Sequence, residues 1–185
     1  MRVIAGSARR IQLRTPEGLG TRPTTDRIKE TLFNMLQPEL ADCRFLDMFS
    51  GSGGIGIEAL SRGAGCAVFV ENNKEALECI RENLKKTRLD GQATVISSDY
   101  LSALQSLNQR GECFDIIFMD PPYRMDYEKK ALEYMVNSSL IHEDSLIIFE
   151  AALETSIDDL EEMGYSIYKV KEYKTNKHIF VTLKN

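Results

Sequence analysis

Asp120-Pro121-Pro122-Tyr123 is the segment whose residue types say most about the chemistry of this chain. It follows the apolar run 114–119, so a carboxylate, two prolines and an aromatic ring stand at the end of a predicted buried strand. The exocyclic amine of a nucleobase is a poor nucleophile, because its lone pair is delocalised into the ring. Asp120 and the carbonyl of Pro121 can accept the two amine hydrogens and direct the nitrogen at an electrophilic methyl group. Tyr123 can stack on the base while the prolines restrict φ, so the segment predicts alkylation of a planar amine.

The same four residues can instead serve only to end a strand with a stiff turn, because prolines often mark ordinary turns. The motifs elsewhere in the chain favour the chemical interpretation. If the amine belongs to a duplex, its base has to be flipped or already unpaired before such a pocket can enclose it.

A glycine-rich loop is predicted between the first strand and the first helix of the core. Gly51, Gly53 and Gly56 have the G-x-G-x-x-G spacing. The first two let the backbone pass close to a ligand, and the third lets the helix pack tightly on the sheet. Dinucleotides and S-adenosylmethionine both bind such loops, and glycine turns can also have a purely steric role.

Three carboxylates, Asp47, Glu71 and Asp99, stand at the ends of successive predicted strands, the edge where open α/β sheets bind ligands. Glu71 can accept hydrogen bonds from ribose hydroxyls of either cofactor. Asp47 would repel a pyrophosphate but favour a nearby ammonium or sulfonium, and Asp99 can accept a hydrogen bond from an adenine amino group. Each also has a structural explanation, namely loop amides for Asp47, solvent exposure for Glu71 and helix capping for Asp99.

Alternating apolar and amphipathic stretches from Cys43 onward predict an α/β, Rossmann-like fold. The predicted strands are 44–49, 67–71, 93–97, 114–119 and 145–150, and the predicted helices are 54–62, 73–87, 99–108, 127–137 and 154–163. Segments 165–173 and 178–183 are joined by only four residues, so they must pair antiparallel. We therefore expect a seven-stranded, mostly parallel sheet with a C-terminal antiparallel hairpin.

Ahead of this core, residues 1–40 are predicted to form an extension to the domain 41–185. Its expected parts are a short β-hairpin (2–4 with 10–13), a linker-like stretch (15–23) and a helix (24–36). Although the net charge is −5, residues 1–29 hold seven basic and two acidic residues, a balance of +5 against −10 elsewhere. These charges could merely solvate a hairpin, but arginines gathered in an acidic chain favour a phosphate-facing patch.

The four cysteines and two histidines lack the spacing of metal ligands, so we expect reduced, packed cysteines and no metal. No stretch reaches 18 uncharged apolar residues, and the first residues lack the features of a signal peptide. We therefore expect a soluble, cytoplasmic protein without membrane contact. We also expect it to be a monomer.

Taken together, the motifs Asp47-x-Phe49-x-Gly51-x-Gly53, Glu71, Asp99 and Asp120–Tyr123 resemble those of class I S-adenosylmethionine-dependent methyltransferases that modify amino nitrogens. With the segments 2–6, 22–27 and 30–34, the chain resembles the RsmD family, bacterial enzymes that methylate the N2 amino group of a guanine in 16S ribosomal RNA. The resemblance spans nearly the whole chain.

The resemblance implies S-adenosylmethionine as methyl donor, with S-adenosylhomocysteine as product, and 16S rRNA in an assembling small ribosomal subunit as partner. It also implies that residues 1–40 face the RNA and cover the cofactor. The implied catalytic residues are Asp120, Pro121, Pro122 and Tyr123. The implied cofactor-binding residues are Asp47, Phe49, Ser50, Gly51, Gly53, Glu71, Asn72, Asp99, Tyr100, Arg22 and Thr24, and the RNA-binding residues are Arg2, Arg9, Arg10 and Arg14.

Other functions stay open. The amine could belong to DNA adenine or cytosine, or to a protein glutamine, although no separate DNA-reading domain is evident. A non-catalytic ribosome assembly factor would keep the fold but gives no reason for an intact Asp-Pro-Pro-Tyr segment. A nicotinamide-dependent oxidoreductase would explain the glycines and Glu71, but neither Asp47 nor that segment. The final proton acceptor, Asp120 or water, is also open.

Overall fold

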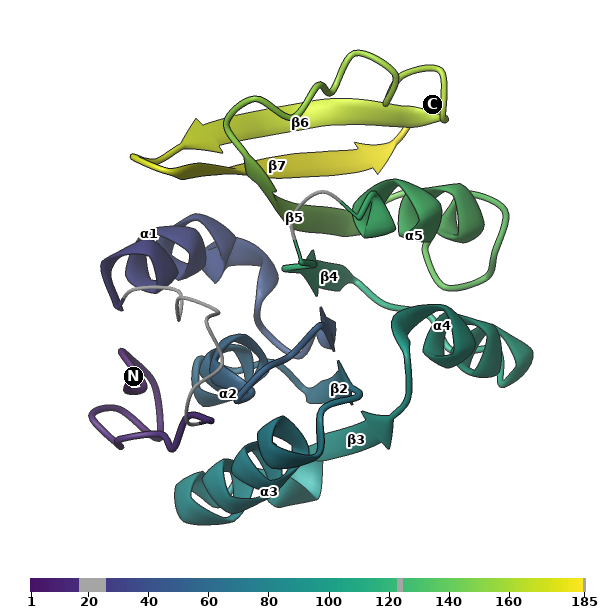
Figure 1. Cartoon of the computed structure of the whole chain (residues 1–185). Helices are drawn as coiled ribbons and strands as arrows, with labels where there is room; N and C mark the ends of the chain where they lie inside the picture. The colour runs from purple at the N-terminus through teal and green to yellow at the C-terminus, as the bar shows by residue number, and fades with distance from the viewer. Residues whose placement is uncertain (17–25, 123–124, 185) are drawn as a thin grey trace. The chain divides into compact units, whose positions relative to one another are not determined.

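The computed structural model describes residues 1–16, 26–122 and 125–184. The chain divides into two structural units, Met1–Asp99 and Tyr100–Asn185. Figure 1 shows the elements of each unit. Among the described residues, three strands lie in the first unit and four in the second.

The first unit has three parallel strands in the order β3-β2-β1, at Ala93–Ser97, Cys66–Glu71 and Arg44–Met48. Its helices are α1 (Asp26–Leu36), α2 (Gly54–Ser61) and α3 (Lys74–Thr87), with short 3₁₀ turns η1 (Gln37–Glu39) and η2 (Asp90–Gln92). Apolar residues make β1 and β2 almost wholly buried, as parallel strands covered on both faces require. The register pairs Asp47 with Phe69 and Glu71 with Ser97.

The second unit has the strand order β4-β5-β7-β6, at Ile116–Met119, Leu146–Ala152, Asn176–Leu183 and Tyr165–Glu172. β4 and β5 are parallel, whereas β7 runs antiparallel to both β5 and β6. The helices α4 (Tyr100–Gln109) and α5 (Tyr127–Met135) lie side by side in Figure 1. The predicted C-terminal hairpin is confirmed, although β6 ends one residue earlier and β7 begins two residues earlier than predicted. In the shorter turn, Tyr173 N donates to Asn176 O at 2.8 Å.

The predicted helix at 154–163 is wrong, because these residues form turns. Ser156 Oγ donates to Asp158 Oδ2 at 3.0 Å and accepts from Asp158 N at 3.3 Å. Such local side-chain bonds compete with a helical backbone. Lys177 Nζ also donates to Thr155 O at 2.8 Å, which holds the start of the segment to β7. The apolar spacing therefore reflects a loop that buries Leu160, and β5 extends two residues further than predicted.

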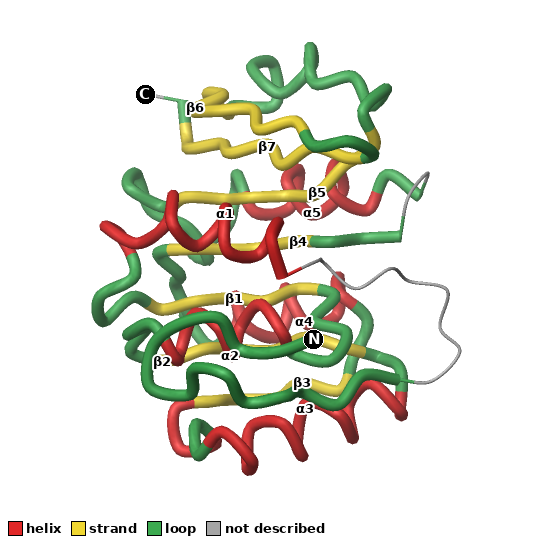
Figure 2. The backbone as a smooth tube through the Cα atoms, turned by 90° about the vertical axis from the view of Figure 1, so that its left-hand side faces the viewer, coloured by secondary structure: helices red, strands yellow, loops and turns green. Residues whose placement is uncertain are grey.

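Residues 1–14, which we call the N-terminal arm, form the predicted hairpin in its shortest form. Arg2 and Gln12 make one antiparallel bridge, and Arg10 N donates to Val3 O at 2.9 Å. Figure 2 shows the arm as a green loop that runs across α2 toward α3. Val3, Ala8 and Leu13 are its buried apolar residues. Within the part of the chain that the structure describes, no helix is long and apolar enough to cross a membrane.

Candidate functional site

The glycine loop joins β1 to α2 through a series of left-handed residues. Phe49, Gly51 and Gly53 have φ values of 60°, 55° and 80°. Gly53 is the N-cap of α2, and its N–H donates to Ser50 O at 2.8 Å. A Cβ on Gly51 would meet nothing within 4 Å, so the loop borders open space at this residue. The predicted strand, loop and helix context of the motif is confirmed, and the loop leaves room for a ligand beside its backbone.

Ser50 fixes this loop to the sheet. Its N–H donates to Val70 O at 3.0 Å, and its Oγ lies 2.6 Å from Asp47 O and 3.2 Å from Val70 O. The hydroxyl therefore bonds to backbone carbonyls of β1 and β2. The Ser50 side chain thus holds the loop in place, and only the backbone of Ser50 is left to contact a ligand.

Asp47 lies inside the fold, with 1% of its surface exposed. Its Oδ2 accepts a hydrogen bond from Gly56 N at 2.8 Å, which ties β1 to the first turn of α2. Burial raises the pKa of Asp47 to about 7, and the nearby charge of Glu71 acts in the same direction, while the Gly56 amide opposes it. Asp47 was expected either to bond loop amides or to favour a positively charged ligand group. The structure contains the first of these, the bond to the Gly56 amide.

Glu71 contacts the other side of the glycine loop. Its Oε2 accepts from Gly51 N at 2.8 Å, and its Oε1 accepts from the amides of Asn72 and Asn73, both at 2.9 Å. The carboxylate is half-buried and Asn72 is exposed. Glu71 and Gly51, predicted as parts of one cofactor site, are thus brought together at the end of β2.

Asp99 and Tyr100 follow β3. Asp99 is exposed and directly precedes α4, a position that suits the capping interpretation as well as a ligand contact. The ring of Tyr100 packs against that of Tyr127, with their centroids 4.9 Å apart.

The Asp-Pro-Pro-Tyr segment begins directly after β4, as predicted. Asp120 is half-buried, Pro121 is buried and Pro122 is exposed. The preceding residue, Met119, pairs with Phe149 on β5, so the segment starts at the carboxyl edge of two parallel strands. The predicted site residues Tyr123, Arg22 and Thr24 lie outside the described residues, as does Pro23.

All four arginines predicted to contact RNA are exposed on the N-terminal arm. Arg2 Nε pairs with Asp26 Oδ2 at 2.9 Å, and Arg14 Nη1 pairs with Glu82 Oε1 at 2.6 Å. Arg9 and Arg10 lie at the tip of the hairpin, and Arg10 has a left-handed φ of 72°. The arm therefore presents two consecutive exposed arginines near its turn.

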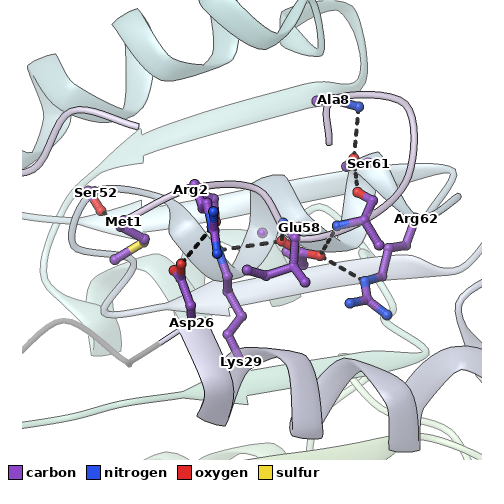
Figure 3. A network of polar contacts seen from close by, with 12 residues as sticks. Met1, Arg2, Ala8, Asp26, Lys29, Ser52, Glu58, Ser61 and Arg62 are labelled. Carbon is purple, nitrogen blue, oxygen red and sulfur yellow. Dashed lines mark hydrogen bonds and ion pairs between the residues drawn. The ribbon is translucent and has the colours of Figure 1, made fainter. Parts of the chain in front are cut away.

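A buried charge cluster beneath the arm was missed by the sequence reasoning. Glu58 on α2 accepts from Ile4 N at 2.8 Å and Ala5 N at 3.0 Å, and it pairs with Arg62 Nε at 2.8 Å and Lys29 Nζ at 3.4 Å. Figure 3 shows these groups converging on the Glu58 carboxylate. Burial lowers the pKa of Lys29 and Glu58 opposes the shift. The available signal was Lys29 itself, a lysine on the apolar stripe that Leu32, Phe33 and Leu36 define.

A second buried polar group lies on β5 and β7. His178 places Nε2 3.3 Å from Glu150 Oε2 and Nδ1 3.3 Å from the hydroxyl of Tyr173. Burial, followed by the charge of Glu150, raises the pKa of Tyr173 to about 12. Among the residues that the structure describes, no group of three His, Cys, Asp or Glu could hold a metal ion. All four cysteines are free.

Comparison with known proteins assigns the family. Residues 1–183 match the family model described as "Conserved hypothetical protein 95". Ribosomal RNA small subunit methyltransferase D of Escherichia coli K12 is 36% identical over 171 residues, covering 92% of this chain and 84% of the relative. YlbH of Bacillus subtilis is 40% identical over 159 residues, which are 86% of each chain.

A solved structure has a similar fold. The solved structure of yhhF from Escherichia coli superposes with a TM-score of 0.83 at 32% identity, covering 100% of this chain and 98% of that one. The Rossmann-like fold expected from the strand and helix pattern, and its class I methyltransferase type implied by the motif resemblance, are thereby confirmed. The chain belongs to the RsmD family, whose model carries the description conserved hypothetical protein 95.

Proposed function

We propose that this chain transfers a methyl group from S-adenosylmethionine to the N2 amino group of a guanine in 16S rRNA. The observation that carries the proposal is the 36% identity, over 92% of the chain, with ribosomal RNA small subunit methyltransferase D. The substrate would be an assembling small ribosomal subunit in the cytoplasm, and the protein would act as a monomer.

The first unit supplies groups that fit S-adenosylmethionine, which when bound supplies an electrophilic methyl group on a sulfonium. The open space beside Gly51 admits a ligand close to the loop backbone. Glu71, already oriented by three amides, offers carboxylate oxygens for ribose hydroxyls. Asp47 places a carboxyl group beneath the loop that favours a positive charge when ionised. Asp99 is the proposed acceptor for the adenine amino group. Phe49, Ser50 and Asn72 are proposed to contact the cofactor as well, and so is Tyr100, the first residue of the second unit.

The second unit supplies the groups for the amine. Asp120 and the carbonyl of Pro121 accept its two hydrogens, which localises the lone pair on nitrogen and directs it at the methyl carbon. Their position directly after the buried strand β4 supports this role, because strands hold functional groups more rigidly than free loops do. Tyr123 stacks on the base. After transfer, the nitrogen loses one proton to Asp120 or to water.

The test is mass spectrometry of rRNA nucleosides from cells that lack this protein. N2-methylguanosine from 16S rRNA should fall by one residue per ribosome and return when the wild-type chain is expressed. Asp120→Ala should fail to restore it, while its affinity for S-adenosylhomocysteine stays within about 3-fold of wild type, since binding and chemistry use different groups.

An unchanged nucleoside profile in the deleted strain would contradict the proposal, as would label from the methyl donor entering only DNA. Restoration by Asp120→Ala would refute the role of that carboxylate and favour a non-catalytic assembly factor.

A further inference from the structure

Asn83, in the middle of α3, joins the N-terminal arm to the glycine loop. It is buried, with 1% of its surface exposed. Its Oδ1 accepts from Arg14 N at 2.8 Å, and its Nδ2 donates to Arg14 O at 2.8 Å and to Ser52 O at 2.9 Å. These three partners fix which end of the side-chain amide is oxygen. In the opposite orientation, Nδ2 would face the donor Arg14 N, and Oδ1 would face the carbonyls of Arg14 and Ser52.

The bond to Ser52 matters because of where this residue lies in the loop. Its carbonyl belongs to the same peptide plane as the N–H of Gly53, which donates to Ser50 O at 2.8 Å. Asn83 holds one side of this plane and Ser50 holds the other. The plane leads into Gly53, the left-handed N-cap of α2. Releasing one side would let the loop reorient at the residues that face the open space.

Met1 makes a second contact between the arm and the same loop. Ser52 Oγ donates to Met1 Sδ at 3.9 Å, and a Cβ on Gly54 would come within 2.2 Å of that sulfur. Figure 3 shows Met1 and Ser52 together, apart from the Glu58 cluster. The arm therefore packs directly on the loop backbone, so a movement of the arm would displace the loop, and a movement of the loop would displace the arm.

In its middle, at residues 4–8, the arm is tied to α2. Ser61 Oγ accepts from Ala8 N at 3.0 Å and donates to Ala5 O at 2.6 Å, and neither bond involves the glycine loop. Ser61 thus offers a matched comparison, since it is a buried polar residue that holds the same arm without contacting the loop.

We propose that Asn83 is a positioning residue that couples RNA binding on the arm to cofactor binding at the glycine loop. This inference rests on the proposed function. RNA that engages the arginines of the arm would order the arm and, through Asn83, the Ser52–Gly53 peptide. By linkage, the cofactor strengthens RNA binding by the same factor.

The test is calorimetric titration of S-adenosylhomocysteine into the full chain, alone and with 16S rRNA from cells that lack the protein. For wild type, RNA should tighten S-adenosylhomocysteine binding at least about 5-fold, the lower end of typical allosteric coupling. Asn83→Ala should bring that ratio to within about 2-fold of one, whereas Ser61→Ala should keep the wild-type ratio. Asn83→Asp is a second variant of nearly the same shape, which keeps the acceptor for Arg14 N but turns an oxygen toward the carbonyls of Arg14 and Ser52, and it should also lose the coupling.

Equal affinities with and without RNA in the wild type would overturn the inference, and so would a wild-type ratio in Asn83→Ala and Asn83→Asp. Loss of the ratio in Ser61→Ala to the same extent would assign the coupling to the arm as a whole and overturn the role of Asn83. If the wild type methylates RNA but lacks coupling, only this inference fails. If it binds neither RNA nor S-adenosylhomocysteine, the proposed function fails as well.

Discussion

A buried carboxyl group on β1 makes the fold sensitive to pH near neutrality. Asp47 has an ordinary pKa of 3.8, which burial raises to about 7. In the unfolded chain it is ionised above about pH 4, whereas in the folded chain it keeps its proton up to about pH 7. The folded state thus holds one more proton between these values, and the stability that this protonation contributes is lost progressively as the pH rises from about 4 to about 7.

We expect Asp47→Asn to flatten this dependence. Its amide oxygen can still accept from Gly56 N, but the residue no longer titrates. Between pH 5 and pH 7 the wild type should lose about 2 kcal/mol of unfolding free energy relative to the variant. Urea unfolding at several pH values measures the difference. Parallel curves for both proteins would show that Asp47 does not titrate in this range.

Gly56 marks the closest approach of α2 to the sheet. A Cβ at this position would lie 2.4 Å from Phe69 Cε1 and 3.1 Å from Asp47 Oδ2. Gly56→Ala should therefore cost about 2 to 3 kcal/mol, because the helix has to move away from a buried ring. Gly91→Ala is the matched control, since a Cβ there meets nothing within 4 Å, and it should change stability by less than about 0.5 kcal/mol. Equal costs would mean that packing on Phe69 is not what requires the glycine.

At the scale of elements, the Glu58 cluster holds α1, α2 and the arm as one assembly. Glu58 is fully buried among two cationic side chains and two amides. Removing its charge would leave Lys29 and Arg62 buried without a counter-charge. Glu58→Gln should therefore cost about 3 kcal/mol or more, whereas Lys29→Met, which leaves Glu58 with Arg62, should cost about 1 kcal/mol or less.

Hydrogen exchange at the amides of Ile4 and Ala5 reports whether the arm detaches. Both amides should lose protection in Glu58→Gln before the helices unfold. Lys129→Met serves as the surface control, because its pair with Asp159 is partly exposed to solvent and should contribute less than about 1 kcal/mol. A larger loss in Lys29→Met than in Glu58→Gln would contradict the assignment of Glu58 as the centre of the cluster.

Elements defined by apolar runs were predictable from the sequence, and contacts between distant polar residues were not. The strands β1, β2 and β3 fell within one residue of prediction. For β1 and β2 the reason is burial on both faces, which leaves a short, mainly apolar run. The segment 154–163 failed because its apolar spacing matches a helix, while Ser156 and Asp158 bond locally. The role of Lys29 was missed because its partner, Glu58, lies 29 residues away, and helix and strand periodicities say nothing about contacts at that separation.

The candidate site divides in the same way. The motif spacing placed Gly51, Glu71 and Asp120 at the ends of strands, and the structure has them there. That Glu71 holds Gly51, and that Asn83 holds Ser52, depends on pairs 20 and 31 residues apart. Such contacts follow from the packing of α2 and α3 on the sheet, which the local sequence does not specify.

At the scale of the whole molecule, an acidic protein with a net charge of −5 would bind a polyanion through a basic region that stands apart. Residues 1–16 contain four arginines and no acidic residue. Because Arg2 and Arg14 already pair with carboxylates, Arg9 and Arg10 at the hairpin tip are the strongest candidates for phosphate contact. Binding to RNA should therefore weaken with salt, and this dependence should report how many phosphates the arm neutralises.

Replacing Arg9 and Arg10 together with glutamine should reduce the steepness of log Kd against log salt concentration by about 1.4, or about 0.7 for each single-strand phosphate that the arm no longer neutralises. Affinity for S-adenosylhomocysteine in the absence of RNA should not change, because neither side chain belongs to the glycine loop.

Arg110→Gln is the control. It removes an exposed arginine that follows α4 and should leave the slope as it is. Filter binding of 16S rRNA from cells that lack the protein, between about 50 and 300 mM salt, gives the slopes. If Arg110→Gln changes the slope as much as the double variant does, the binding depends on total charge; if neither does, the phosphate contacts lie elsewhere than the tip of the arm.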